Sequence, residues 1–444
     1  MPSILALILC TIFVLYLLRL DRKQSPDVSR AFWIPTIWML YIASKTLAFW
    51  FGAGGESVES GSPLDQVFIS VLLCMGMILL VFRKFSWSRA MKGNAWLILL
   101  IGYMLVSVLW SDIPFISFKR WIRDVLVALI MAFVVATERD PRQSMESLLR
   151  RSVYILIPFS ILLIKYFPKF GVVYSRWEGT LMWTGVTSHK NGLGRLCMIS
   201  AFFLVWSLFK RWQGRDKPVA KYQTYADVFV LIMTIVLLIG PGGVYSATSI
   251  GALATGLVAF VSLLWMKKRQ INLRVNTWVV IMALIIVYGI SVPMMGGLSL
   301  GGVTSGFGRD ATLTGRTAIW AGLLHYAEQH PILGCGYGGF WTTRMIEKFE
   351  VNEAHNGYLE LLLELGYVGL FLTAVFLLSC VRKAQRELVY NFDWGLFWIC
   401  LLLMVVVHNI AEASISSFSS QSTATILFLA VSSTAPFSYP REIS

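Results

Sequence analysis

The sequence predicts an all-α protein that crosses a membrane about 12–13 times and forms a single integral membrane domain over residues 1–444. Hydrophobic residues make up 57% of the chain and charged residues only 14%, whereas soluble domains carry about 25% charged residues. Apolar runs recur from end to end, and each is close to the length of about 20 residues that a helix needs to cross a bilayer. Because no polar stretch is long enough to bury its own core, we expect no separate soluble domain.

The expected spans follow one another along the whole chain. In order they are residues 2–20, 31–52, 64–82, 95–110, 115–136, 152–167, 191–209, 225–240, 248–266, 276–295, 357–380, 393–410 and 420–436. The first run has no basic residue before it and no small-residue cleavage site after it, so we do not expect it to be a cleaved signal peptide.

Lysine and arginine are concentrated in alternate loops between these spans. Basic clusters follow the first, third, fifth, seventh, ninth and eleventh spans, whereas the loops 52–65, 241–246 and 409–417 contain no lysine or arginine. Loops that hold positive charge stay in the cytoplasm, so the basic loops are expected inside and the others outside. The formal net charge of +14 therefore reflects orientation in the membrane, and we expect no nucleic-acid partner.

Some cations and all the histidines depart from this alternation. The cations on the side expected to be outside are Lys119, Arg120, Arg123, Lys165, Lys169, Arg176, Lys190, Arg309, Arg316, Arg344 and Lys348. The histidines in outer loops or at outer helix ends are His189, His325, His330, His355 and His408. Cations and imidazoles gathered outside a membrane indicate an anionic ligand that is handled there.

Two of these clusters have competing interpretations. Arg120 and Arg123 in SFKRWIRDV either belong to the site or anchor the helix at the membrane interface beside Trp121. The segment 174–194 contains tryptophans that an aromatic belt at the interface would explain. That explanation does not cover its polar run Ser188-His189-Lys190-Asn191 at a helix start, which favours a functional role.

The long outer loop, residues 296–356, is expected to carry part of the active site. Its first part, 296–310, is rich in glycine and serine and predicts mobile chain, and 312–331 predicts an amphipathic helix with Thr314 as its cap. The side expected to face the membrane holds Ile319, Trp320, Leu323, Leu324 and Ala327. Arg316 falls in the first turn, where a cation opposes the helix dipole, so we expect another reason for its position. The glycine-rich stretch 334–341 predicts a turn; its GxGxxG follows no strand, which argues against a dinucleotide site.

Several of these segments together resemble one known family. TGRTAIW, HPILGCGYGGFW and EAHNGYLELLLELGYVG resemble the signature of the O-antigen ligase and Wzy polymerase superfamily, and most closely the polymerases of succinoglycan-type exopolysaccharides. SRWEGTLMWTGVTSHKNGLG resembles the family's other outer motif, and WSDIPFISFKRWIRD its stretch before the fifth span. The likeness runs from about residue 105 to 415. The family commonly has about twelve spans with both ends inside, so the thirteen counted here imply an added first span or one span too many.

The resemblance implies a glycosyltransferase in the bacterial inner (cytoplasmic) membrane with its active site facing the periplasm. Its donor would be a glycan linked through pyrophosphate to undecaprenol, and it would use no cofactor. In a polymerase the acceptor is a sugar hydroxyl of the next lipid-linked repeat unit, whereas a ligase would transfer a finished glycan to lipid A or another acceptor. Membrane lipid is an expected partner, as are a flippase and a chain-length regulator of the same export pathway.

A polysaccharide transporter is the alternative from another class. A transporter would place its charges near the membrane midplane and often shows internal repeats. Here the polar residues gather at the outer face and no repeat is detected, which favours the enzyme.

The leaving lipid pyrophosphate gains negative charge as the glycosidic bond breaks, and arginine offers it paired, permanently charged donors. By match to the family motifs, Arg176 and Arg316 are the first candidates to bind the pyrophosphate. Arg309, Lys190, Arg120 and Arg123 are the second candidates.

His355 is the candidate base for the acceptor hydroxyl because it lies at a helix N-terminus, where the dipole favours the neutral imidazole. A purely capping role is the alternative. Glu360 and Glu364 share one helix face and, with His189, are candidates to orient the imidazole, pair with an arginine or bind the acceptor. No DxD motif occurs on the outer side, and we expect no metal site.

Overall fold

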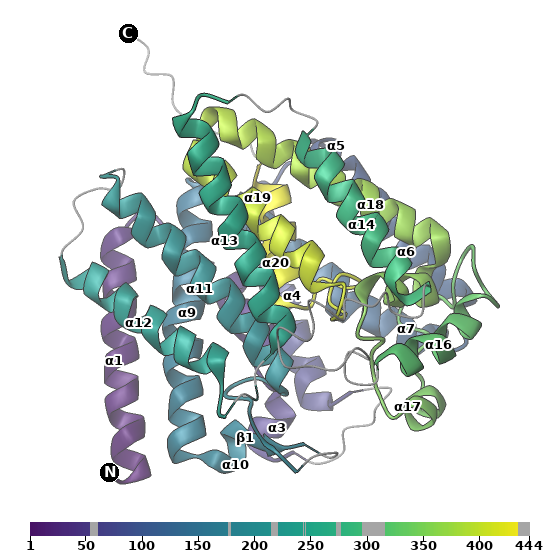
Figure 1. The fold of residues 1–444 in the computed structure, drawn as a ribbon, viewed down its shortest axis with the longest axis horizontal. Helices are drawn as coiled ribbons and strands as arrows, with labels where there is room; N and C mark the ends of the chain where they lie inside the picture. The colour runs from purple at the N-terminus through teal and green to yellow at the C-terminus, as the bar shows by residue number, and fades with distance from the viewer. Residues whose placement is uncertain are drawn as a thin grey trace.

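The structure is a computed structural model that describes residues 1–53, 61–175, 179–214, 221–242, 244, 246–271, 277–294 and 316–433. Within these ranges the expected all-α membrane fold is confirmed, because nearly all regular structure is helical (Figure 1). Seven of the described helices are long and apolar enough to cross a membrane, and they are α1, α4, α9, α11, α12, α13 and α18.

The elements follow the order of the expected spans. The first half contains α1 (Ser3–Gln24), α2 (Trp33–Ile42), α3 (Leu47–Phe51), α4 (Pro63–Phe82), α5 (Trp87–Gly93), α6 (Ala95–Ser107), α7 (Pro114–Trp121), α8 (Val127–Ala136), α9 (Pro141–Tyr166), α10 (Pro168–Gly171), β1 (Val172–Tyr174) and β2 (Leu181–Trp183). The second half contains α11 (Lys190–Trp212), α12 (Lys221–Ile239), α13 (Ala247–Lys268), α14 (Thr277–Met294), α16 (Arg316–Ala327), α17 (Thr343–Phe349), α18 (Gly357–Tyr390), α19 (Phe392–His408) and α20 (Gln421–Ser432). Short 3-10 turns lie at Arg30–Phe32 and Val108–Trp110, and a π-helical turn at Ile122–Leu126 joins α7 to α8.

The expectation of one continuous span over 31–52 was wrong, because α2 and α3 are separate helices. Lys45 lies between them and donates hydrogen bonds to the backbone oxygens of Phe170 (2.5 Å) and Gly185 (2.8 Å). A lysine inside an apolar run needs such acceptors, and here the loop before α11 supplies them. That loop also contains a hairpin, β1 paired antiparallel with β2, which an all-α prediction did not include.

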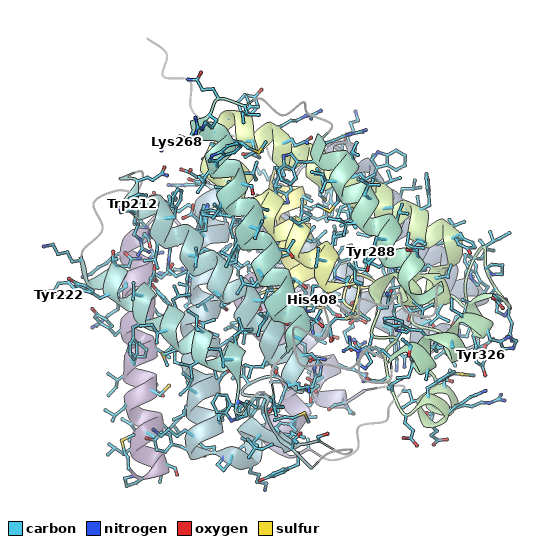
Figure 2. The ribbon with its side chains drawn as sticks, in the orientation of Figure 1. Trp212, Tyr222, Lys268, Tyr288, Tyr326 and His408 are labelled. Atoms are coloured by element: carbon cyan, nitrogen blue, oxygen red, sulfur yellow. The ribbon has the colours of Figure 1, made fainter. Side chains whose placement is uncertain are left out.

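The basic loops meet at one end of the helix bundle, here called the basic end. Arg142 at the start of α9 pairs with Glu387 near the end of α18 (2.7 Å), and Lys210 near the end of α11 pairs with Glu146 of α9 (2.9 Å). Figure 2 shows Lys268, the last residue of α13, at the same end of the view as Trp212. The opposite end holds α3, α10, β1, α16 and α17 (Figure 1) and is here called the histidine end.

Helix α18 is broken at Gly366, which has φ +63° and ψ −165°. The break removes the bond that would join Leu363 O to Tyr367 N, and both groups find partners in the loop before α17. Cys335 N donates to Leu363 O (2.9 Å), and Tyr367 N donates to Pro331 O (2.8 Å). Backbone groups inside a membrane must be satisfied in this way. The glycine-rich turn therefore approaches protein backbone, at the point where α18 is interrupted.

The described part of the amphipathic helix expected over 312–331 is α16, which ends at Ala327, and its apolar side does not face the membrane as expected. Trp320 and Leu323 of α16 are fully buried against α18 and the glycine-rich turn. Trp320 Nε1 also donates to Ala354 O (2.9 Å), which ties α16 to the segment that carries His355. Other parts of the protein, and not lipid, cover the apolar side of α16. The sequence pattern alone is compatible with either. Segment 296–310 and Thr314 lie outside the described residues.

Candidate active site

Glu412 is the centre of a polar cluster at the histidine end. It lies in the loop between α19 and α20, and its Oε1 accepts hydrogen bonds from Arg316 Nη2 (2.7 Å) and Asn191 Nδ2 (2.7 Å). Arg316 also donates to Ala411 O. Three segments that are distant in sequence therefore meet at one carboxylate. The pairing also supplies the reason for a cation in the first turn of α16, where the helix dipole opposes it.

His355 lies beside this cluster, in contact with a second carboxylate. Its Nδ1 is 2.9 Å from Oε1 of Glu353, although the ring is turned so that the contact has poor hydrogen-bond geometry. Burial acts to raise the pKa of Glu353, but His355, His189 and Arg195 outweigh it and hold that pKa below its ordinary value. A carboxylate that stays ionised beside an imidazole can orient the ring and stabilise its protonated form.

The alternative that His355 caps a helix was wrong. Asn356 is the N-cap of α18, and its Oδ1 accepts from Tyr358 N (3.0 Å) and Leu359 N (2.9 Å). His355 precedes the cap and has φ +50°. This left-handed conformation is uncommon outside glycine and clusters at functional sites.

Glu360 holds the backbone around His355. Its Oε2 accepts from Ala354 N (2.7 Å) and its Oε1 from Trp341 Nε1 (2.5 Å). Because Ala354 is the residue before His355, this buried carboxylate fixes the chain that carries the imidazole. Of the roles open to Glu360, orienting His355 through the backbone is the one that these contacts support.

A polar cavity of about 140 Å³ adjoins the start of α11. It is lined by His189, Arg195, Ser420 and Gln421, among others. Arg195 has no ion-pair or hydrogen-bond partner among the described residues, and both amide atoms of Gln421, which is only 3% exposed, also lack partners there. The cavity therefore offers a free cation and a free amide to an anionic or hydroxyl-bearing ligand.

His189 is the N-cap of α11, and its Nδ1 accepts from Gly192 N (3.0 Å). Its ring is exposed at the cavity. The surrounding protein still limits its hydration, and together with the neighbouring Arg195 cation this keeps the pKa of His189 below its ordinary value. Because Nδ1 accepts from Gly192 N, the neutral ring carries its proton on Nε2 and can donate a hydrogen bond to a ligand in the cavity.

Glu353, His355 and Glu412 each offer one ligand atom, and these atoms lie within 4.8 Å of one another. This set is compatible with a divalent cation. One oxygen of Glu412 accepts from both Arg316 and Asn191, so a guanidinium already neutralises part of the charge of this set.

The second-choice cations lie in different surroundings. Arg120 donates to the backbone oxygens of Gly338 (2.5 Å) and Trp341 (3.3 Å), and thus supports the glycine-rich turn. Arg123 forms a two-bond pair with Asp124 (2.7 and 2.8 Å). Glu364 is buried near Arg120 and accepts from the backbone of Gly338. These residues form a scaffold around the turn, apart from the Glu412 cluster.

Lys190 is the first residue of α11, next to Asn191. Arg176 and Arg309 lie outside the described residues. The sequence-based site omitted Glu353, Glu412 and Arg195. Two signals pointed to the last two: Glu412 is the only acidic residue of the loop 409–417, and Arg195 is a charge inside an expected span.

The fold and the site define a polytopic membrane protein with a cluster of histidine, carboxylate and arginine side chains at one end of its helix bundle. The family described as O-Antigen ligase matches residues 233–374. A curated relative, the exopolysaccharide production protein ExoQ of Rhizobium meliloti (strain 1021), is 23% identical over 333 residues, which cover 71% of each chain. The resemblance to the O-antigen ligase superfamily is thereby confirmed, and the two comparisons support a polymerase or ligase role.

Proposed function

We propose that this chain is a glycosyltransferase that polymerises undecaprenyl-pyrophosphate-linked oligosaccharide repeat units into exopolysaccharide on the periplasmic side of the bacterial inner membrane. The convergence of Arg316, Asn191 and Glu412 beside His355 carries the proposal. These residues come from the segments that resemble the family's motifs and from the loop before α20. The relative whose name refers to exopolysaccharide production supports the polymer as the product.

In the proposed reaction the acceptor hydroxyl attacks the anomeric carbon of the donor glycan. His355 takes the hydroxyl proton as the new carbon–oxygen bond forms, and the bond from the anomeric carbon to the pyrophosphate breaks with its electron pair leaving on the phosphate oxygen. Rotation of the ring to direct Nδ1–H at Glu353, whose Oε1 is 2.9 Å away, would leave Nε2 as the nitrogen that accepts the proton. Glu353 then stabilises the imidazolium.

Arg195 and Arg316 are the described cations best suited to the leaving pyrophosphate. Arg195 lines the cavity and has no partner among the described residues, so its donors are available to an anion. Arg316 is held by Glu412 and Ala411, so it would add positive potential while organising the site. Fixed charge of this kind acts on the leaving group without reorganisation during the reaction. Arg176, Arg309 and Lys190 remain proposed hydrogen-bond donors to the pyrophosphate, because they lie in segments that resemble the family motifs.

We propose that the reaction is independent of a metal ion, because Arg316 already pairs with Glu412 and arginines would receive the pyrophosphate. Activity of purified protein should persist after treatment with a chelator and should not rise when Mg²⁺ or Mn²⁺ is restored. Loss of activity with the chelator and recovery with one of these ions would instead assign the cluster of Glu353, His355 and Glu412 to a metal.

An O-antigen ligase-type transfer to lipid A or another acceptor is the second candidate, because the matching family is described as O-Antigen ligase. Glycan analysis of a strain that lacks this chain separates the two. A polymerase mutant makes single repeats and loses long polymer. A ligase mutant instead accumulates finished polymer on its lipid carrier. We expect the first result.

The periplasmic side of the site is tested by reporter fusions at Lys348, in the last turn of α17, and at Lys268, at the basic end. The alternation of basic loops predicts opposite signals, with Lys348 outside. A cytoplasmic signal at Lys348 would remove the basis for the whole site assignment.

A further inference from the structure

Helix α1 and the start of α2 form a groove at the basic end that the proposed reaction does not use. Its volume is about 920 Å³. Along α1 its lining is apolar, and Ile12, Leu15 and Tyr16 are 58%, 57% and 45% exposed there. Trp33 of α2 also lines the groove. Since α1 is long and apolar enough to cross a membrane, acyl chains would cover this lining in a bilayer.

The same groove is lined by four arginines: Arg19, Arg22, Arg30 and Arg151. No carboxylate is among the described residues that line it. Arg19 and Arg30 are exposed and have no hydrogen-bond or ion-pair partner in the described part of the chain. Arg22 donates to Val28 O (2.5 Å). The groove therefore joins an apolar lining along α1 to a cluster of arginines.

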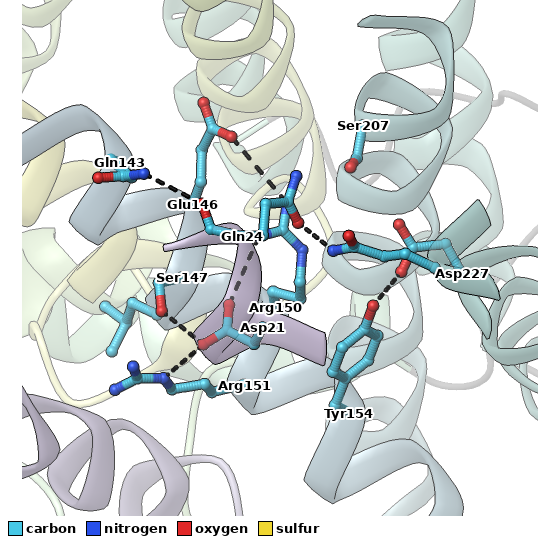
Figure 3. Close-up of polar contacts among 12 residues, drawn as sticks. Asp21, Gln24, Gln143, Glu146, Ser147, Arg150, Arg151, Tyr154, Ser207 and Asp227 are labelled. Atoms are coloured by element: carbon cyan, nitrogen blue, oxygen red, sulfur yellow. Dashed lines mark hydrogen bonds and ion pairs between the residues drawn. The ribbon is translucent and has the colours of Figure 1, made fainter. Parts of the chain in front are cut away.

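Arg151 shows that the described residues neutralise this charge only in part. It is only 3% exposed, and its Nε pairs with Oδ2 of Asp21 at 2.7 Å (Figure 3). Asp21 also faces Arg150 at 3.4 Å, so one carboxylate serves two buried guanidinium groups. Nη1 of Arg151 has no hydrogen-bond partner among the described residues. Buried polar groups nearly always have one; here the guanidinium also lies over the Trp33 ring, 4.9 Å from its centroid, and the ring stabilises its charge at the wall of the groove.

We propose that the groove binds an anionic phospholipid. Its phosphate would be held by the four arginines, and an acyl chain would lie along Ile12 and Leu15. Arginine binds phosphate through paired, charge-assisted hydrogen bonds, and basic clusters beside a transmembrane helix attract anionic lipids of the adjacent leaflet. A second copy of this chain is a poorer occupant, because it would bring the same cations against these.

The test titrates full-length protein in detergent with phosphatidylglycerol or phosphatidylcholine and counts bound lipids by native mass spectrometry. The variant Arg19→Gln/Arg30→Gln should bind phosphatidylglycerol about 30-fold more weakly than wild type, as expected for two lost cations. The control Lys268→Gln/Arg269→Gln removes two exposed charges at the same end of the bundle and should leave this site unchanged. Phosphatidylcholine should bind weakly to all three proteins.

An equal loss in the control would mean that phosphatidylglycerol senses only the general basic surface, and the site would be withdrawn. Equal affinity for phosphatidylcholine would also overturn the proposal. A dimer that persists without lipid and dissociates on Leu15→Asp would assign the groove to a second copy. Thermal unfolding of each variant in lipid-free detergent checks that it is folded. If the double variant is unfolded, Arg19→Gln alone should weaken binding about fivefold.

Discussion

The two ends of the helix bundle both concentrate charge, but they neutralise it differently. At the basic end, Asp21, Arg150 and Arg151 are 0%, 1% and 3% exposed and pair with one another between α1 and α9 (Figure 3). At the histidine end, Arg316 retains 13% exposure of its side chain beside Glu412, and Arg195 opens onto a cavity with no partner in the described residues. Counting cations would not distinguish the two ends.

The difference separates charges that hold helices together from charges that can meet a substrate. Burying an ion pair away from solvent costs desolvation free energy. Removing one partner then leaves the other charge buried and unpaired. Charges beside a cavity keep their capacity for a new partner, which an anionic substrate requires. We therefore expect substitutions at the histidine end to act on turnover and those at the basic end to act on stability.

The largest expected effect is on turnover, from His355→Ala. Loss of a positioned proton acceptor should lower transfer by roughly 10²–10⁴, while the protein stays folded because Asn356 caps α18. Polymer synthesis by purified protein of matched amount measures the effect. His325→Ala, an exposed histidine on α16, is the control and should retain activity. Wild-type turnover in both variants would end the assignment of His355 as the base.

At the basic end, Asp21→Asn should instead reduce stability. It leaves Arg150 and Arg151 without their shared carboxylate, and breaking a buried pair costs roughly 3–5 kcal/mol. Thermal unfolding in detergent should show a clearly lower midpoint, and activity per folded molecule should be kept. Asp27→Asn, at an exposed position just after α1, should change neither. A variant of wild-type stability would contradict the structural role of the network.

A smaller effect on turnover is expected from Arg316→Lys. Lysine keeps the charge but cannot contact Glu412 and Ala411 as a fork. Activity should fall about 10–100-fold, the equivalent of one lost hydrogen bond to a charged group. The matched change Arg344→Lys, at an exposed position in α17, should be mild. Equal activity in the two variants would mean that residues other than Arg316 act on the pyrophosphate.

The smallest expected effect concerns pH and His189. The folded protein lowers the pKa of this ring. The contribution of the neutral ring to the free energy of unfolding is therefore complete above the ordinary histidine pKa of about 6.5. It is lost as the pH falls below that value. The unfolding midpoint should lose a degree or two in this window. His189→Asn caps α11 without titrating and should lack this component. An unchanged acid response in His189→Asn would exclude His189 as its source.

Most helices could be predicted from the sequence because the length of an apolar run is a local property. The interruptions could not. The break between α2 and α3 depends on acceptors near Phe170 and Gly185, and the break in α18 depends on the loop that ends at Cys335. Family motifs led to His355 and Arg316. The partner Glu412 lies 96 residues from Arg316, and no local pattern links such positions.

The interruption of α18 has a mechanical consequence. Since the loop at Pro331 and Cys335 completes the hydrogen bonds of the broken helix, loop and helix behave as one rigid body, and this part of the loop cannot swing open as a lid. Glu360 joins Trp341 and Ala354 to the same body. In the proposed reaction a glycan would therefore meet the backbone of His355 already in position, and any closing motion during turnover would come from other segments.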